Sequence, residues 1–205
     1  MGIQYYFEIF GIFFYGISGA LAADEKSGKD WFGVTFTAFV TAIGGGTIRD
    51  VLLGSFPISW IKDVNMLYAV MLGIIMAALF YKFFLKLRKT FMLFDTLGIA
   101  LFTIVGVEKA LNLGVSPIVA IIMGMFTAIM GGVIRDMMIN EIPVVFRKEI
   151  YASACLMGAI IYVILEFFDI SRNITFFVSG GVIVVIRMLA VQYNLTCLLY
   201  TSDAA

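Results

Sequence analysis

The chain has 205 residues, of which 62% are hydrophobic and 14% are charged, and 14 basic residues balance 14 acidic ones. With a mean hydropathy of +1.04, it has more apolar surface than a soluble core of this length can bury, so we predict an integral membrane protein. The neutral net charge gives no support for nucleic-acid binding. The absence of histidine removes the commonest metal ligand and the usual base of a serine or cysteine nucleophile. We therefore expect no enzyme, no metal site and no cofactor.

Seven apolar runs come close to the roughly 20 residues that a helix needs to cross a bilayer. The expected spans are residues 5–23, 31–53, 64–81, 91–107, 110–134, 150–168 and 173–193. The predicted fold class is therefore an all-α integral membrane protein with seven transmembrane helices. The first run lacks the basic start and the small-residue cleavage site of a secretory signal, so we expect it to be retained.

Basic residues in the connections predict the orientation in the membrane. Nine lie in the first, third and fifth connections: Lys26, Lys29, Lys82, Lys86, Arg88, Lys89, Arg135, Arg147 and Lys148. Four lie in the second, fourth and sixth: Arg49, Lys62, Lys109 and Arg172. Because basic residues favour the cytoplasmic side, the N-terminus is expected outside and the C-terminus in the cytoplasm.

One motif occurs twice. The sequence TAIGGGTIRD at residues 41–50 returns as TAIMGGVIRD at residues 127–136, and Pro57 and Pro143 keep the same spacing of 86 residues. Each copy belongs to a group of three spans, and an odd number of crossings inverts the second group relative to the first. We expect one three-helix repeat at 5–81, an inverted repeat at 91–168, a seventh helix at 173–194, and a non-native or disordered tail at 195–205.

The glycines of the motif are candidates for an ion pathway. A glycine inside a helix costs about 1 kcal/mol relative to alanine, so consecutive glycines predict a kink or an unwound turn. Carbonyl oxygens freed there can replace the hydration shell of a monovalent cation. The alternative is that small residues simply allow helices to pack closely, but their duplication beside an Arg-Asp pair favours the pathway. The candidate pathway residues are Thr41, Gly44, Gly45, Gly46, Thr127, Gly131 and Gly132.

The two Arg-Asp pairs are candidates for a gate or a substrate clamp. Inversion places Arg49 and Asp50 at the outer mouth and Arg135 and Asp136 at the inner mouth. Each arginine follows the last glycine by nearly one helical turn, on the same face. Alternatively, the arginines extend to the membrane surface and the aspartates neutralise them. Both interpretations stay open for the aspartates, and the functional one is favoured for the arginines.

Other charged residues predict more ordinary roles. Glu8 and Asp95 occupy matching positions near the starts of their spans and are expected to cap those helices, with a cation-attracting pair in the pore as the alternative. Glu108 and Lys109 are expected in an aqueous loop, and Arg187 is expected to extend to the membrane surface.

The paired motif, with Phe94-Asp95 opening the second repeat and RMLAVQYN closing the last helix, resembles a known family over residues 5–194. This is the bacterial family with tandem UPF0126, or glycine-transporter, domains, which is similar to the trimeric intracellular cation (TRIC) channels. The resemblance implies a homotrimer with a potassium-selective pore in each protomer, lined by the second and fifth helices. Some bacterial relatives are associated with glycine uptake.

The resemblance also implies roles for residues of the motif. The five glycines would form kinks in the two helices, and Arg49 and Arg135 would line the pathway. Met130 departs from the pattern, because the family often has a third glycine there. The two halves are therefore expected to differ, with residues 44–46 as the stronger candidate for the break that contacts the ion.

Two functions remain open. The first is a passive monovalent cation channel in the bacterial inner membrane, permeable to K+ and with Na+ as a further candidate. The second is a secondary transporter for glycine or a similar small amino acid. Inverted repeats favour the transporter, whereas glycine-rich segments without an obvious acidic coupling residue in the membrane favour the channel.

Overall fold

The computed structural model describes residues 2–27, 30–81, 83, 90–147, 149–193 and 195. Eight α-helices and one 3-10 turn occur in this part of the chain, and the all-helical prediction is confirmed. They are α1 (Ile3–Ser27), α2 (Trp31–Leu52), α3 (Ser59–Lys62), α4 (Val64–Leu79), α6 (Thr90–Asn112), α7 (Pro117–Met138), η1 (Val144–Phe146), α8 (Ala152–Phe167) and α9 (Arg172–Tyr193). The expected tail lies outside the described residues, apart from Leu195.

Five of these helices, α1, α2, α6, α7 and α9, are long and apolar enough to cross a membrane. Two more, α4 and α8, coincide with expected spans and are apolar, but each has only 16 residues. The chain is thus an all-helical, multi-pass membrane protein. The predicted orientation of its ends stays a prediction.

One predicted boundary is wrong. The loop expected around Glu108 and Lys109 is helical, because α6 continues to Asn112. The turn follows at Gly114, whose positive φ of 76° suits a glycine after a helix end. Pro117 then begins α7, a position where its missing amide hydrogen is not needed. The helix-stop signals lie a few residues beyond the two charges that suggested a loop.

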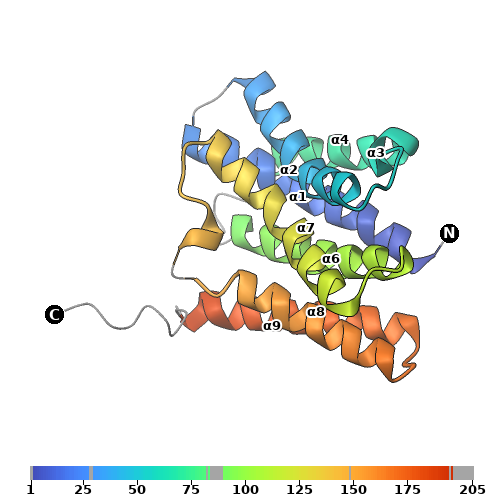
Figure 1. The fold of residues 1–205 in the computed structure, drawn as a ribbon. Helices are drawn as coiled ribbons and strands as arrows, with labels where there is room; N and C mark the ends of the chain where they lie inside the picture. The colour runs from blue at the N-terminus through green and yellow to red at the C-terminus, as the bar shows by residue number, and fades with distance from the viewer. Residues whose placement is uncertain are drawn as a thin grey trace.

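The helices run roughly side by side, and their directions differ between the two halves of the chain (Figure 1). Helix α1 packs against α2, α4 and α6, and α7 packs against α2, α6 and α8. Helices α1 and α6 run in opposite directions, as do α2 and α7. The C-terminal ends of α2 and α7, which carry the two Arg-Asp pairs, therefore lie at opposite ends of the bundle (Figure 1).

Candidate functional site

Both Arg-Asp pairs lie in the last turn of a helix that ends in the same way. After α2, Gly54 has a φ of 63°, and the amide of Ser55 donates to the Asp50 carbonyl at 2.8 Å. After α7, Asn140 has a φ of 57°, and the amide of Glu141 donates to the Asp136 carbonyl at 2.9 Å. These left-handed ends use the helix carbonyls that would otherwise lack partners. They also fix the backbone from which each arginine and aspartate extends.

The first pair belongs to the Arg49 cluster, which we define as Glu8, Arg49, Asp50, Ser59 and Lys109. Arg49 is fully buried and contacts Asp50 and Glu8 at 2.7 Å each. Lys109 extends from α6 into the same cluster, where its ammonium group donates to Asp50 Oδ1 at 2.7 Å and to Ser59 Oγ at 2.8 Å. The other Asp50 oxygen accepts from the amide and hydroxyl of Ser59. Two carboxylates thus balance two cations.

The second pair belongs to the Arg135 cluster, which we define as Ser18, Asp95, Arg135, Asp136 and Val144. Arg135 is fully buried and contacts Asp95 at 2.6 Å, Asp136 at 2.8 Å and the Ser18 hydroxyl at 3.0 Å. The second Asp136 oxygen accepts from the amide of Val144. The guanidinium also lies over the ring of Phe91, 4.5 Å from its centroid. Here two carboxylates share one cation.

These clusters change the interpretation of several charged residues. Glu8 and Asp95 do not cap helices: both are buried ion-pair partners of the arginines. The arginines do not extend to the surface, because their side chains have no exposed area. The expected neutralisation by the aspartates is present in both clusters. Sequence reasoning paired Glu8 with Asp95 by register but not with the arginines, which lie 41 and 40 residues further along the chain.

Three further charged residues were also placed wrongly. Lys109 is part of the Arg49 cluster, and Glu108 is buried and ion-paired with Arg172 of α9. Arg187 is buried, donates to the carbonyl of Ile150 at 2.7 Å and lies over the ring of Tyr151. A charge within a long apolar run is the signal that could have indicated these positions, because such residues usually face the protein interior.

The motif glycines bring α2 and α7 close together. A side-chain carbon added at Gly45 would collide with the Thr127 carbonyl oxygen, and one added at Gly131 would lie 2.6 Å from the Thr41 carbonyl oxygen. The contact is more relaxed at Gly44, where the nearest atom is 3.1 Å away, and at Gly46, where it is 3.7 Å away. Close helix approach thus requires glycine at Gly45 and Gly131.

The expected unwound turn is absent from both motifs in this structure. Helices α2 and α7 are continuous through Gly44, Gly131 and the neighbouring glycines. The helical bonds persist because each glycine segment is packed against the other helix. The hydroxyls of Thr41 and Thr127 donate at 2.6 Å to carbonyls one turn earlier in their own helices. A kink at the glycines and a contact of these threonines with an ion stay predictions.

An aromatic pair beside the glycines was not identified from the sequence. Tyr15 of α1 and Phe102 of α6 are buried, and their rings stack with centroids 5.1 Å apart. The Tyr15 hydroxyl donates to the Ala128 carbonyl of α7 at 2.5 Å. The two rings lie at matching positions of the two repeats. An alignment of the two halves of the sequence could therefore have identified them as a pair.

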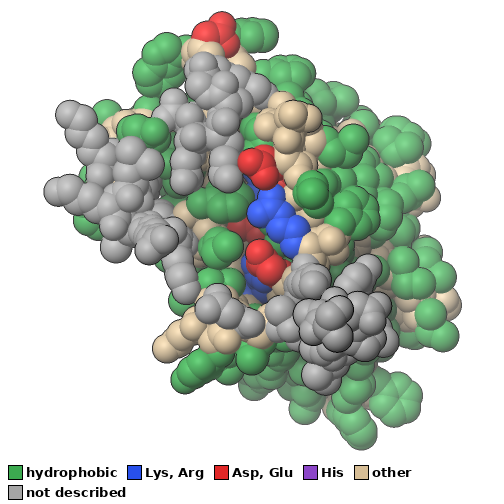
Figure 2. Space-filling view, turned by 90° about the vertical axis from the view of Figure 1, so that its left-hand side faces the viewer, with side chains coloured by type: hydrophobic (Ala, Val, Ile, Leu, Met, Phe, Trp, Pro, Cys, Tyr) green, Lys and Arg blue, Asp and Glu red, His purple; other side chains and the backbone are tan. Residues whose placement is uncertain are grey.

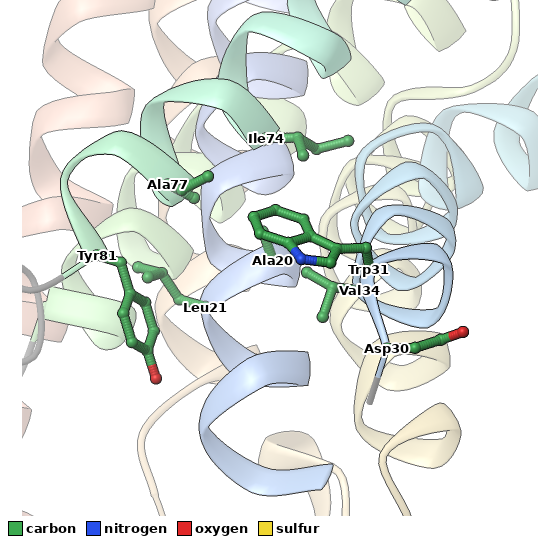
Figure 3. A pocket seen from close by; sticks show the side chains of 9 residues that line it. Ala20, Leu21, Asp30, Trp31, Val34, Ile74, Ala77 and Tyr81 are labelled. Atoms are coloured by element: carbon green, nitrogen blue, oxygen red, sulfur yellow. The ribbon is translucent and has the colours of Figure 1, made fainter. Parts of the chain in front are cut away.

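Two cavities differ in their relation to the clusters. A small cavity of about 10 Å³ adjoins Glu8, Gly46 and Ser59, with room for about one water molecule. A larger one of about 300 Å³ lies between α1, α2 and α4 at the other end of α2. In Figure 3, the Trp31 indole lies across it and the Asp30 carboxylate points away. Its largely apolar lining gives it no part in the candidate ion pathway.

The end of the bundle at which α7 terminates is charged at its centre. Figure 2 shows acidic and basic side chains gathered in a hollow there, with hydrophobic side chains around them. Arg147 and Glu141, which follow α7, form a partly exposed ion pair of 3.3 Å at this end. Arg135, which is fully buried, lies in the last turn of α7 and therefore at this same end.

Comparison with known proteins identifies the family. The family model described as glycine transporter matches residues 5–82 and 92–166. The chain belongs to the TRIC-type UPF0126 family. The UPF0126 membrane protein of Vibrio cholerae is 43% identical over 161 residues, covering 78% of this chain and 67% of the relative. The UPF0126 inner membrane protein YadS of Escherichia coli K12 is 35% identical over 195 residues, 94% of each chain.

Solved structures carry the same fold as this UPF0126 protein. The TRIC orthologue of Rhodobacter sphaeroides matches with a TM-score of 0.86 and 31% identity, covering 95% of this chain and all of the other. A prokaryotic TRIC channel crystallised in 0.5 M KCl matches with a TM-score of 0.84 and 32% identity, covering 95% and 98%. The resemblance inferred from the repeated motif is therefore confirmed.

Proposed function

We propose that this UPF0126 protein is a monovalent cation channel, permeable to K+, and not an enzyme. The observation that carries the proposal is the pairing of α2 and α7, which touch through glycines in the interior and end in buried ion clusters at opposite ends of the bundle. The R. sphaeroides neighbour is described as a trimeric intracellular cation channel orthologue, and a second neighbour with a TM-score of 0.85 as a cation channel that conducts.

The proposed topology has seven crossings, with an inverted repeat at 5–81 and 91–168 and a seventh helix at 173–194. The match of one family model to two successive segments and the opposite directions of α1 and α6 support this division. The excess of basic residues in the odd-numbered connections supports an N-terminus outside and a C-terminus in the cytoplasm. The inner-membrane description of the E. coli relative supports the same bacterial membrane.

In the proposed pathway, a cation passes between α2 and α7. Carbonyl oxygens beside Gly44, Gly45 and Gly46 and beside Gly131 and Gly132 would contact it, together with Thr41 and Thr127. The Arg49-Asp50 and Arg135-Asp136 pairs would act as gates, one at each mouth. Each protomer would contain its own pore, and the protein would be a homotrimer, as the neighbour's description indicates for that protein.

One observation favours glycine, or a similar amino acid, as a second candidate substrate. Arg49 Nη1 and Arg135 Nη2 are buried and have no hydrogen-bond acceptor among the described residues. A guanidinium nitrogen of this kind is a suitable partner for a substrate carboxylate. This would make the chain a secondary transporter.

Purified protein in liposomes distinguishes the two functions. We expect K+ flux down an imposed gradient, without saturable uptake of labelled glycine. Arg135→Lys should change the flux, because lysine keeps the charge but cannot form the same two ion pairs at once. Arg147→Lys, at the partly exposed pair of the same end, is the matched control and should leave flux unchanged. Saturable glycine uptake with negligible K+ flux would refute the channel.

A further inference from the structure

Tyr15 connects α1 to the helix that carries the second glycine motif. Its side chain is fully buried, and its hydroxyl donates to the Ala128 carbonyl of α7 at 2.5 Å. Its ring lies against Gly98 of α6 and Gly131 of α7, where added side-chain carbons would collide with it or approach within 3.1 Å. The packing of the ring against α6 and α7 therefore holds the hydroxyl at the Ala128 carbonyl.

The Ala128 carbonyl has a particular position in α7. In an α-helix it accepts from the amide four residues later, which is the amide of Gly132. A carbonyl oxygen has two acceptor sites, so the Tyr15 bond and the helical bond coexist. If α7 opens at Gly131 and Gly132, the helical bond is lost and the carbonyl keeps Tyr15 as its partner. A buried carbonyl left with no partner would make the same opening much less favourable.

Helix α2 lacks this arrangement, although it has the same motif. Phe102 occupies the matching place: its ring lies 3.3 Å from a carbon added at Gly11, and 4.0 Å from one added at Gly46 of α2. The carbonyl that corresponds to Ala128 is that of Ala42, 86 residues earlier. Phenylalanine has no hydroxyl, so it offers no donor to this carbonyl. Of the two stacked rings, only that of Tyr15 carries a hydroxyl, and this hydroxyl donates to a carbonyl of α7.

We infer that α7 is the helix that opens first, at Gly131 and Gly132, and that the Tyr15 hydroxyl stabilises the opened state by retaining the Ala128 carbonyl. Helix α2 stays helical during this step. The order differs from the expectation based on Met130, which favoured residues 44–46. The inference adds an opening mechanism to the proposed channel. It rests on the proposed function only for the statement that the opening conducts cations.

Hydrogen exchange of the full-length protein in nanodiscs tests the order directly. In the wild type, amides of residues 131–132 should exchange faster than those of residues 45–46. Tyr15→Phe should slow exchange at 131–132 by roughly five- to tenfold, the effect of one net hydrogen bond. A merely structural bond would give the opposite result, because its removal would loosen α7 and speed exchange. Unchanged or faster exchange in Tyr15→Phe overturns the inference.

Mirror variants sharpen the test. Phe102→Tyr places a hydroxyl on the α2 side and should speed exchange at residues 45–46, and Tyr15→Phe combined with Phe102→Tyr should transfer the faster exchange from α7 to α2. Tyr5→Phe removes a hydroxyl that contacts the exposed Asn65, and is the control that should change neither segment. A double variant whose exchange remains fastest in α7 would contradict the assigned role of Tyr15.

Cation flux in liposomes, measured on the same variants, separates this inference from the proposed function. Tyr15→Phe should lower the cation flux by a similar factor, because a smaller fraction of the channels is open. If no variant conducts, the channel proposal fails while the exchange result still decides which helix opens. If the channel conducts and exchange does not follow the hydroxyl, only the role of Tyr15 fails.

Discussion

The Arg49 and Arg135 clusters begin from the same three charges and are completed differently. In both, a buried arginine near a helix end binds the adjacent aspartate and a carboxylate from the first helix of the same half, Glu8 or Asp95. The Arg49 cluster adds Lys109 from the other half of the chain, whereas the further partners of the Arg135 cluster among the described residues are neutral. Among the described residues, the Arg49 cluster is therefore balanced in charge, and the Arg135 cluster holds one more carboxylate than cations.

This difference shows that the duplicated motif sets the position of each ion pair but not its charge balance. A buried charge needs close partners, and an ion pair from which one partner is removed is strongly destabilised. At the Arg49 end, two cations share that task. In the described part of the Arg135 cluster, one guanidinium contacts both carboxylates and lies over the ring of Phe91.

The largest expected effect follows from this imbalance. Arg135→Ala should lower the free energy of unfolding by about 3–5 kcal/mol, because it removes the cation that both buried carboxylates contact among the described residues. Arg49→Ala should cost less, since Lys109 remains beside Asp50. Denaturant titration of both variants in the same detergent measures the difference.

A charge-matched variant is the control for Arg135→Ala. Combining Arg135→Met with Asp95→Asn and Asp136→Asn removes all three charges of the cluster and should recover much of the lost stability. Equal costs for Arg49→Ala and Arg135→Ala would show that Lys109 does not share the neutralisation, and the comparison of the two ends would fail.

The motif itself was the part of the site that sequence could predict. Its repetition identified Arg49, Asp50, Arg135 and Asp136, and all four are buried in matching contacts. The remaining members come from distant segments, and their contacts depend on how the helices pack. A carboxylate near a helix start, such as Glu8, is readily explained as a helix cap. Its ion pair with Arg49 is visible only in the tertiary structure.

The fold was predictable where apolar runs were interrupted by turn residues. The boundary after α6 was misplaced because Lys109 looked like a solvent-exposed charge, although its partner Asp50 lies in another helix. The glycines predicted an unwound turn from local propensity alone. In the structure, both helices are continuous, and Gly45 and Gly131 instead allow the backbones of α2 and α7 to pack closely against each other.

The second prediction compares glycines within one motif. Gly45→Ala should destabilise the protein by about 3 kcal/mol, because the new carbon collides with the Thr127 carbonyl across the helix contact. Gly46→Ala is the matched control: its nearest neighbour would be 3.7 Å away, so the helix propensity of alanine should leave stability unchanged or raised by up to about 1 kcal/mol. Thermal unfolding of both variants measures the difference, and similar losses would contradict a packing role specific to Gly45.

The smallest expected effect concerns the residue that distinguishes the two clusters. Lys109→Met should lower the free energy of unfolding by about 2 kcal/mol, since it removes charged hydrogen bonds to Asp50 and Ser59. Lys109→Arg keeps the charge and should lose less. In the Lys109→Met background, the Arg49 cluster has the charge of the Arg135 cluster, so the cost of Arg49→Ala should rise toward that of Arg135→Ala. A double-mutant cycle measures this coupling, and additive losses would show that the two cations act independently.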